Sequence, residues 1–431
     1  MTTAARAATL RKLATACNEP LDSPIELERR HGANTYHPLP VLLTRGEGVW
    51  LFDADGRRYL DMMSAYSAVS FGHSHPVLVR ALTDQAQKLA VTSRAFHTDQ
   101  LGPFLRTLCR LTGMARALPM NSGAEAVETG IKAARKWAYK VKGVPNGQAQ
   151  IIVAEGNFSG RTTTLVGFSS DAQYRDGFGP FTPGFVTVPF GDAAALEAAI
   201  TPHTAAFIVE PIQGEAGIIV PPTGYLKAVR EICTRHNVLM LCDEVQTGLG
   251  RTGKMLACDH EGVRPDGLML GKALGGGLLP VSAFLARADV MAQFTPGDHG
   301  STFGGNPLAC AVGCAALELL ESEQLAERAL EQGDYLMAQL RQLNHPAITD
   351  IRGKGLLIGV QIDPAFASAR AVCEALMLEG VLTKDTHQTV VRLAPPLVIA
   401  REQIDIAVAA LGRVLRSMQA PAERGMEVAT V

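Results

Sequence analysis

The sequence predicts an α/β protein with a large domain, built on a mainly parallel sheet flanked by helices, and a smaller α+β domain. Between residues 151 and 240, short apolar segments alternate with connecting segments, a pattern typical of a parallel sheet with helices on both faces. Near the end of the chain, two apolar segments (356–362 and 390–393) precede an amphipathic helix at 401–418. The 431 residues suffice for two or three domains with a large core.

The expected elements begin with a hairpin, because residues 49–51 and 58–62 are apolar and are separated by the turn sequence Asp53-Ala-Asp-Gly56. A helix is predicted at 125–141, with Asn121 or Ser122 as its cap. The further elements, in order, are strands at 151–153, 185–188 and 205–209, a helix at 224–236, strands at 238–242 and 267–270, and a long helical stretch at about 306–342.

We expect these elements to form a large domain at 71–305 and a small domain at 306–431, which residues 1–70 would join as an N-terminal segment. The first eighteen residues contain three cations and no acid, a composition found in mitochondrial transit peptides. On a helix, however, Arg6, Arg11 and Lys12 would be spread around the whole circumference. We therefore favour a ragged N-terminus over a transit peptide.

The composition favours small-molecule chemistry in a reducing compartment. The formal net charge is only −2, so no basic surface suggests nucleic acid or a membrane as a partner. No run of 18 uncharged apolar residues occurs, which argues against a transmembrane helix. The eight cysteines are scattered without a C-x-x-C pair, as expected of reduced thiols. These features predict a cytoplasmic protein, with the mitochondrial matrix as the less favoured compartment.

Lys272 follows the apolar segment 267–270, which predicts a short buried strand. The lysine would then lie at the carboxyl edge of the sheet, where open α/β folds bind their ligands. A buried or cation-flanked lysine loses its proton more easily, and the neutral amine can form a Schiff base with a carbonyl. A plain surface turn is the alternative for a Lys-Ala-Leu-Gly segment.

Asp243 ends the apolar segment 238–242, which has the pattern of a strand covered on both faces. A desolvated carboxylate at that position needs a cation. Pyridoxal phosphate supplies one in its protonated ring nitrogen, while a lysine holds its aldehyde. The alternative is an aspartate that caps the following turn. Together with Lys272, Asp243 therefore predicts a pyridoxal-phosphate site.

Three further motifs are less specific. The small turn before the helix at 125–141 would offer free N–H groups to a phosphate, although an ordinary helix cap fits it as well. His73 and His75 have no third ligand nearby, so a loop at a helix start is favoured over a metal site. The sequence Gly248-Leu-Gly-Arg-Thr-Gly253 matches a dinucleotide-binding motif but lacks its strand-turn-helix context.

Taken in order, four motifs resemble the class III, fold type I pyridoxal-phosphate aminotransferases, over about residues 25–418. They are Ser122-Gly-Ala before a helix, Asp243-Glu-Val-Gln-Thr-Gly248, Gly271-Lys-Ala-Leu-Gly275 and Gly300-Ser-Thr-Phe-Gly-Gly-Asn-Pro307. Within the family, the chain is most similar to the members that act on the δ-amino group of ornithine. This similarity is carried by the stretches Asn34–Pro40, Ser64–Val69, Thr92–Phe96, Gly156–Thr162, Pro211–Gly217 and Arg392–Leu397.

The resemblance implies roles around the cofactor. Lys272 would hold the cofactor and move the substrate proton, and Asp243 would keep the ring nitrogen protonated. Gln246 would bind the ring hydroxyl and Phe158 would stack on the ring. The phosphate would be bound by Ser122, Gly123 and Ala124, and by Thr302 of a neighbouring subunit, which implies a homodimer.

The resemblance also implies transfer of the δ-amino group of L-ornithine to 2-oxoglutarate. Arg161 would bind the ornithine α-carboxylate, with Tyr36 holding that end and Tyr66 lining the pocket. Arg392 would bind the carboxylate beside the keto group of 2-oxoglutarate, and Glu215 would neutralise Arg392 when ornithine is bound.

Several alternatives remain open. Another ω-aminotransferase would act on N-acetylornithine, 4-aminobutyrate or lysine. An isomerase or decarboxylase, or a cofactor-binding protein without turnover, would use the same scaffold. One departure from the family pattern is Ser159, at a position where a bulky aromatic residue is usual.

Overall fold

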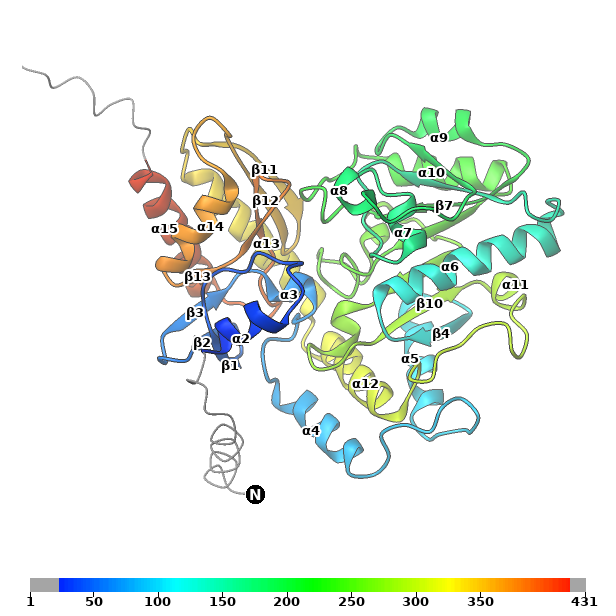
Figure 1. Ribbon diagram of the computed structural model, residues 1–431, viewed down its shortest axis with the longest axis horizontal. Coiled ribbons are helices and arrows are strands. Elements are labelled where there is room, and N and C mark those ends of the chain that lie inside the picture. Colours follow the sequence, from blue (N-terminus) through cyan, green and yellow to red (C-terminus); the bar gives the residue numbers. More distant parts are fainter. Residues whose placement is uncertain (1–22, 419–431) are drawn as a thin grey trace, which may run out of the picture. The chain divides into compact units, whose positions relative to one another are not determined.

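The computed structural model describes residues 23–418, which form two compact units (Figure 1). The first unit comprises the residues up to Arg45 together with 52–58. Its helix α2 (Pro24–His31) begins at Ser23, whose side chain and that of Glu26 form a reciprocal capping box. Strands β1 (Leu43–Glu47), β2 (Trp50–Asp53) and β3 (Arg58–Asp61) then carry the chain into the second unit. The two strands of the expected hairpin are therefore present.

The second unit is built on a seven-stranded sheet within the described residues. Strand β10 pairs antiparallel with β4 and β9, whereas the pairs among β9, β8, β7, β5 and β6 are all parallel. The prediction of a mainly parallel sheet is confirmed. In spatial order, the strands are β4 (Arg116–Met120), β10 (Ser282–Ala286), β9 (Gly267–Leu270), β8 (Leu239–Asp243), β7 (Thr204–Val209), β5 (Gln150–Ala154) and β6 (Phe185–Val188).

Apolar side chains fill both faces of this sheet. Ile151 and Val153 of β5 share a core cluster with Ile131 of helix α6 (Gly123–Trp137). Ile152, which lies between them in the strand, belongs to a different core cluster, which also contains Val229 of α10 (Tyr225–Arg235). Because successive side chains of a strand point to opposite faces, this division places core on both sides of the sheet. The continuous apolar runs in the sequence reflect that double burial.

A second sheet of four antiparallel strands lies in the C-terminal part, in the order β11, β12, β15 and β14. Helices α13 and α14 pack on this sheet, and α15 packs on both helices (Figure 1). The strands and helices are β11 (Ile348–Lys354), β12 (Leu357–Ile362), β14 (Lys384–Thr386), β15 (Val390–Leu393), α13 (Leu325–Gln342), α14 (Ala369–Leu378) and α15 (Arg401–Ser417).

The prediction of one long helical stretch at about 306–342 was wrong, because this part of the chain forms two helices. It consists of α12 (Pro307–Ser322) and α13, separated at Gln324, whose φ of 50° is left-handed and ends helical geometry. Helix α6 begins at Gly123, two residues earlier than expected, because Ser122 is its cap. After Trp137 it continues as a π-turn at Ala138–Lys142.

Several short elements complete the chain. Strand β13 (Val381–Leu382) pairs in parallel with Leu60 and Asp61 of β3. No helix among residues 23–418 is both long and apolar enough to cross a membrane. The remaining helical segments are α3 (Ser64–Ser67), α4 (Pro76–Ala86), α5 (Leu101–Thr112), α7 (Thr163–Gly167), α8 (Ala172–Arg175), α9 (Ala193–Ala199), α11 (Ala288–Met291) and the 3₁₀ turns at Ala257–Glu261 and Lys272–Gly275.

Close packing of α13 against the β11–β12 turn gives the first testable prediction. A Cβ on Gly333 of α13 would lie 2.1 Å from the backbone oxygen of Gly355. Gly333→Ala should therefore lower the free energy of unfolding by about 1 to 3 kcal/mol, as measured by denaturant titration. The matched control is Gly102→Ala in α5, where the added methyl group meets open space. This control should raise stability by up to about 1 kcal/mol; equal effects of the two substitutions would contradict the packing argument.

Candidate functional site

The carboxyl ends of two adjacent parallel strands bring Asp243 and Lys272 to one edge of the main sheet. Asp243 is the last residue of β8, and Lys272 follows β9 after one glycine. Lys272 has a φ of 46°, a left-handed conformation that costs about 1 to 3 kcal/mol in a non-glycine residue and is typical of functional sites. Burial lowers the pKa of Lys272 to about 8, with the charges of Glu215, Arg392 and Asp243 as smaller contributions. An amine with this pKa can act as a nucleophile and as a proton carrier near neutral pH.

Asp243 is a buried carboxylate without a cationic partner in the described part of the chain. Its Oδ1 accepts a hydrogen bond from the backbone N–H of Val245 (3.2 Å), and its Oδ2 accepts one from Ser159 Oγ (3.1 Å). Burial raises the pKa of Asp243 to about 6, despite these hydrogen bonds and the charge of Lys272. The site therefore suits a cationic group such as a protonated ring nitrogen. Ser159, which departs from the family pattern, is a hydrogen-bond donor to this carboxylate.

Glu210 was missed in the sequence, although it directly follows the apolar strand β7, much as Asp243 ends β8. Its two oxygens accept hydrogen bonds from the backbone N–H groups of Phe158 (3.0 Å) and Gly214 (3.3 Å). Burial, reinforced by the charge of Asp243, raises the pKa of Glu210 to about 8. Glu210 thereby joins the loop that carries Phe158 to the loop that carries Glu215. An acid that directly follows a buried apolar run was the signal that could have identified it.

The N-terminus of α6 leaves two backbone donors open. Ser122 and Glu125 form a capping box in which Glu125 Oε2 accepts from the N–H of Ser122 (2.7 Å) and Ser122 Oγ accepts from the N–H of Glu125 (3.2 Å). The N–H groups of Gly123 and Ala124 have no hydrogen-bond partner among the described residues. Donors at the positive end of a helix suit a phosphate. The N–H of Ser122 is already occupied, so the two following residues offer the open donors.

Gln246 presents an open acceptor beside these groups. Its Nε2 donates to Glu215 Oε1 (3.1 Å), whereas its Oε1 is buried and has no partner in the part of the chain that the structure describes. A Cβ on Gly214 would lie only 2.0 Å from Oε1, so this space requires glycine. A buried acceptor without a donor suits the hydroxyl group of a cofactor ring. The unpaired Asp243, the open N–H groups and this acceptor together fit pyridoxal phosphate.

An ion pair closes the substrate side of the site. Arg392 of β15 is buried, and its two Nη atoms donate to the two oxygens of Glu215, each over 2.8 Å. Burial alone would raise the pKa of Glu215, but the charge and hydrogen bonds of Arg392 lower it to about 2. Gln246 and Lys272 contribute in the same direction. Removing one partner of such a pair typically costs about 3 to 5 kcal/mol of stability, because the other charge is left buried and unpaired. Arg392 therefore needs a carboxylate beside it.

Tyr66 lies over this pair in a strained turn. Its ring centroid is 5.1 Å from Cζ of Arg392 and 5.9 Å from Nζ of Lys384. The four residues Ser64 to Ser67 all have left-handed φ angles, between 45° and 73°. None of them is glycine, so no residue in this stretch indicates a left-handed turn. Such residues cost about 1 to 3 kcal/mol each and persist only where their surroundings hold them.

The remaining predicted residues lie in exposed or loop positions. Arg161 is exposed, with Cζ 4.5 Å from the ring centroid of Tyr174 and 6.0 Å from that of Phe158. No described carboxylate pairs with Arg161, which leaves its guanidinium available to an anion. Thr302 is exposed in the loop before α12, and Tyr36, in the first unit, is 70% exposed. The roles expected for Thr302 and Tyr36 stay predictions.

The histidine motif has another setting, because His73 Nε2 pairs with Asp61 Oδ2 (2.7 Å) and His75 lies 3.7 Å from Glu323.

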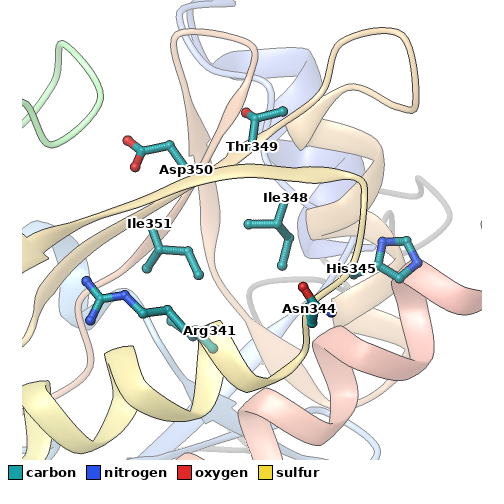
Figure 2. Close-up of a pocket in the computed structure, with 8 residues that line it drawn as sticks. Arg341, Asn344, His345, Ile348, Thr349, Asp350 and Ile351 are labelled. Carbon is teal, nitrogen blue, oxygen red and sulfur yellow. The ribbon is translucent and has the colours of Figure 1, made fainter.

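A pocket of about 400 Å³ lies at the end of α13 and the start of β11, and it is lined by Leu340, Arg341, Asn344, His345 and residues 348–351 (Figure 2). None of the residues that line it belongs to the site around Lys272. The site is therefore recognised by its chemistry rather than by the size of a cavity.

Comparison with known proteins gives consistent matches over most of the chain. The sequence profile of the family described as "Aminotransferase class-III" matches residues 31–415. An ornithine aminotransferase from Halalkalibacterium halodurans is 57% identical over 392 residues, which cover 91% of this chain and 98% of that protein. The structure of an ornithine aminotransferase from Toxoplasma gondii ME49 matches with a TM-score of 0.90 at 44% identity, covering 92% and 94% of the two chains. An acetylornithine aminotransferase from Elizabethkingia anophelis matches with a TM-score of 0.83 at 50% identity, covering 91% and 98%.

The unpaired state of Asp243 leads to a prediction for the protein freed of cofactor. Because the pKa of Asp243 is raised from 3.8 to about 6, the folded state holds this proton more tightly than the unfolded state does. The free energy of unfolding therefore falls as the pH rises from about 4 to about 6, and the total loss above pH 6 is about 3 kcal/mol. Asp243→Asn should remove the loss. In thermal denaturation, the cofactor-free variant should be more stable than the parent protein at pH 8, with little difference at pH 4.

The matched control is Asp266→Asn. Asp266 is also buried, but it pairs with Arg230 (2.8 Å) and Arg287 (2.5 Å). Its substitution should destabilise the protein at pH 8, because Arg230 loses its carboxylate partner and Arg287 keeps only Asp289 (2.8 Å). An Asp243→Asn effect of equal size at pH 4 and pH 8 would show that ionisation is not its cause.

Proposed function

Because the chain belongs to the aminotransferase class-III family, we propose that it transfers the δ-amino group of L-ornithine to 2-oxoglutarate. The products are glutamate 5-semialdehyde, which cyclises to pyrroline-5-carboxylate, and glutamate. The observation that carries the proposal is the buried Arg392–Glu215 pair beside Lys272, with the unpaired Arg161 as a second anion site. The names of the relatives from Halalkalibacterium halodurans and Toxoplasma gondii support the same substrate.

Pyridoxal phosphate, when bound, supplies an aldehyde that takes up the amino group and a ring that draws electrons from the reacting carbon. Lys272 would hold this aldehyde and, once released, would remove and return the substrate proton through Nζ. Asp243 would keep the ring nitrogen protonated, and Gln246 Oε1 would accept from the ring hydroxyl. The phosphate would lie at the N-terminus of α6, at the N–H groups of Gly123 and Ala124. Phe158 would stack on the ring.

The two substrates place different demands on one site. Ornithine must present its terminal amine, so its α-carboxylate must bind at a distance from Lys272, for which exposed Arg161 is suited. While ornithine is bound, Glu215 would neutralise Arg392 and so disfavour substrates that present an α-carboxylate there. For 2-oxoglutarate, Glu215 would release Arg392 to the carboxylate next to the keto group. The bidentate geometry of the pair fits this exchange, since a substrate carboxylate can take the place of that of Glu215.

A second candidate function follows from the 50% identity to the acetylornithine aminotransferase from Elizabethkingia anophelis. That substrate differs from ornithine only in its acylated α-amine. Tyr36 and Tyr66 favour ornithine, because a free α-amino acid group needs polar partners that an acylated one needs less. Tyr66 lies within reach of Arg392, whereas the role of Tyr36 at the ornithine end is part of the proposal.

The proposal extends to assembly, domains and compartment. We place the cofactor-binding domain at 71–305 and the small domain at 306–431. Thr302 of each subunit would reach the phosphate in its partner, so the enzyme would be a homodimer. A cytoplasmic location is supported by the seven cysteines within residues 23–418, all of which are free thiols.

The proposal is tested by the visible absorption spectrum of the purified holoenzyme, recorded before and after addition of L-ornithine. The band of the bound cofactor should fall with ornithine alone and return with 2-oxoglutarate, and Lys272→Ala should abolish this cycle. In steady state, kcat/KM should favour L-ornithine over N-acetylornithine, 4-aminobutyrate and lysine by at least about tenfold, or about 1.4 kcal/mol. If ornithine leaves the band unchanged, the amino donor must be another amine. If the protein binds no cofactor, the proposal is refuted altogether.

The switch role of Glu215 gives a separate prediction. Glu215→Ala leaves Arg392 permanently free, so the rate with α-amines such as glutamate should rise relative to the rate with ornithine. The ratio of the two kcat/KM values measures this change, which should be about tenfold or more if the ion pair controls access.

The matched control is Thr386→Val. Thr386 Oγ1 donates to the backbone oxygen of Glu215 (2.5 Å) but does not touch its carboxylate. This control should leave the ratio near that of the parent enzyme. If Glu215→Ala also leaves it unchanged, the switch assignment is wrong.

A further inference from the structure

The sequence Gly248-Leu-Gly-Arg-Thr-Gly253, which resembles a dinucleotide-binding motif, places an arginine inside the protein. Leu249, Gly250 and Gly253 have left-handed φ angles, so the segment is an irregular turn after β8 rather than the start of a helix. Its Arg251 has no exposed surface. A fully buried guanidinium in a turn of this kind requires an explanation, because charged groups are rarely buried without a role.

Arg251 makes four hydrogen bonds, and none is to a carboxylate. Nη1 donates to the backbone oxygens of Leu356 (2.9 Å) and Pro395 (2.6 Å). Nη2 donates to Ser64 Oγ (3.2 Å) and Ser70 Oγ (3.1 Å). Burial lowers the pKa of Arg251 to about 9, with the charge of Asp61 opposing. The four acceptors belong to three separate segments of the chain, which the fork of one guanidinium holds together.

Two of these segments carry residues of the substrate side. Ser64 begins the left-handed turn that contains Tyr66, and Pro395 follows Arg392 by three residues. The two segments are also joined directly, because Ser64 Oγ donates to the backbone oxygen of Ala394 (2.7 Å). Arg251 therefore lies where the turn that carries Tyr66 meets the strand end that carries Arg392.

Asp61 also supports the start of this turn. Asp61 Oδ1 accepts from the backbone N–H groups of Met63 and Ser64, both over 2.8 Å, and Oδ2 pairs with His73. Four successive left-handed residues do not hold this shape by themselves. The turn thus depends on bonds to Asp61 and from Arg251. The Arg251 bonds reinforce direct bonds to the Arg392 side, in which the N–H groups of Ala394 and Leu397 donate to the backbone oxygens of Met62 (2.7 Å) and Ser70 (2.8 Å).

We propose that Arg251 is a positioning residue for the α-carboxylate of 2-oxoglutarate, because it holds the turn of Tyr66 against the strand end that carries Arg392. This inference rests on the proposed function in one respect, the assignment of Arg392 to that carboxylate. Loss of the contact lets Tyr66 and Arg392 move apart. Binding at Arg392 then weakens most, because both Tyr66 and Arg392 are displaced there, whereas ornithine keeps its contact with Arg161 and loses only what Tyr66 contributes.

The test uses the holoenzyme and three variants. Arg251→Lys keeps the charge but cannot make the forked contacts, and Ser64→Ala removes the hydroxyl that bonds both Arg251 and Ala394. Ser64→Ala keeps the proposal testable if the arginine variant does not fold. The matched control is Thr252→Val, which removes a buried hydroxyl from the same motif on the side that contacts His260 (3.2 Å).

Three readouts are expected to change together in Ser64→Ala. The KM for 2-oxoglutarate and the dissociation constant of glutarate, an unreactive dicarboxylate, should each rise about fivefold or more, while the KM for ornithine should rise by a clearly smaller factor. Hydrogen exchange in peptides covering residues 62–71 should accelerate without any substrate present. Arg251→Lys should show the same pattern more strongly, and Thr252→Val should show none of it.

The outcomes separate this inference from the proposed function. Equal increases in both KM values, or unchanged exchange at 62–71, would overturn the positioning role and leave Arg251 as a structural residue. A parent enzyme that prefers N-acetylornithine would refute the proposed amine substrate. Glutarate binding and hydrogen exchange would still decide the role of Arg251, since neither requires turnover.

Discussion

The parallel pairing of β8 with β9 is the interaction on which the site depends. Cys242 is paired with Leu268 and Asp243 with Met269, so the two chains leave the sheet side by side. Both strands are buried throughout, which fixes their register because a slip of one residue would exchange their two faces. Asp243 and Lys272 are therefore brought together by main-chain hydrogen bonds in the core, without any need for contact between their side chains.

Burial at this edge also sets the chemistry of the charged groups. Low polarity raises the pKa of Asp243 and Glu210 and lowers that of Lys272, in each case by disfavouring the charged form. Glu215 is the exception, because Arg392 meets it with two hydrogen bonds and a full charge. Groups without a fixed partner in the chain are thus the ones that are poised to change their protonation when a ligand arrives.

The sequence allowed the main elements of the site to be predicted, because its apolar runs are long and its glycines are placed at turns. The strands before Asp243 and Lys272 and the helix after Ser122 were found from these local patterns. The antiparallel strand β10 was missed, although residues 283–286 form an apolar run, because the run is short and two of its residues are alanines, which are depleted in strands. Pairing order and register depend on distant segments, which a local pattern does not report.

Two features of the substrate side were not predicted, the conformation of the turn that carries Tyr66 and the contacts of Arg251, and they share one physical reason. Tyr66 lies in a left-handed turn built without glycine, so its conformation is imposed by hydrogen bonds from elsewhere in the fold. Arg251 was considered only as part of a sequence that matches a dinucleotide-binding motif. Its hydrogen-bond partners lie more than a hundred residues away along the chain. Strain and buried polar bonds are tertiary properties, and they become visible only when the segments that supply them are assembled.

The anchoring of Glu215 determines how fast its carboxylate can leave Arg392. The main chain of this residue is fixed by Thr386, which bonds its carbonyl oxygen, while Glu210 holds the preceding Gly214. Only the side-chain torsions of Glu215 are then free to change. Rotamer changes of exposed side chains take picoseconds to nanoseconds, whereas movements of lids and domains take microseconds or longer. In the proposed exchange, the barrier to the departure of Glu215 would therefore come from the two hydrogen bonds to Arg392 that must break, and not from a movement of the main chain.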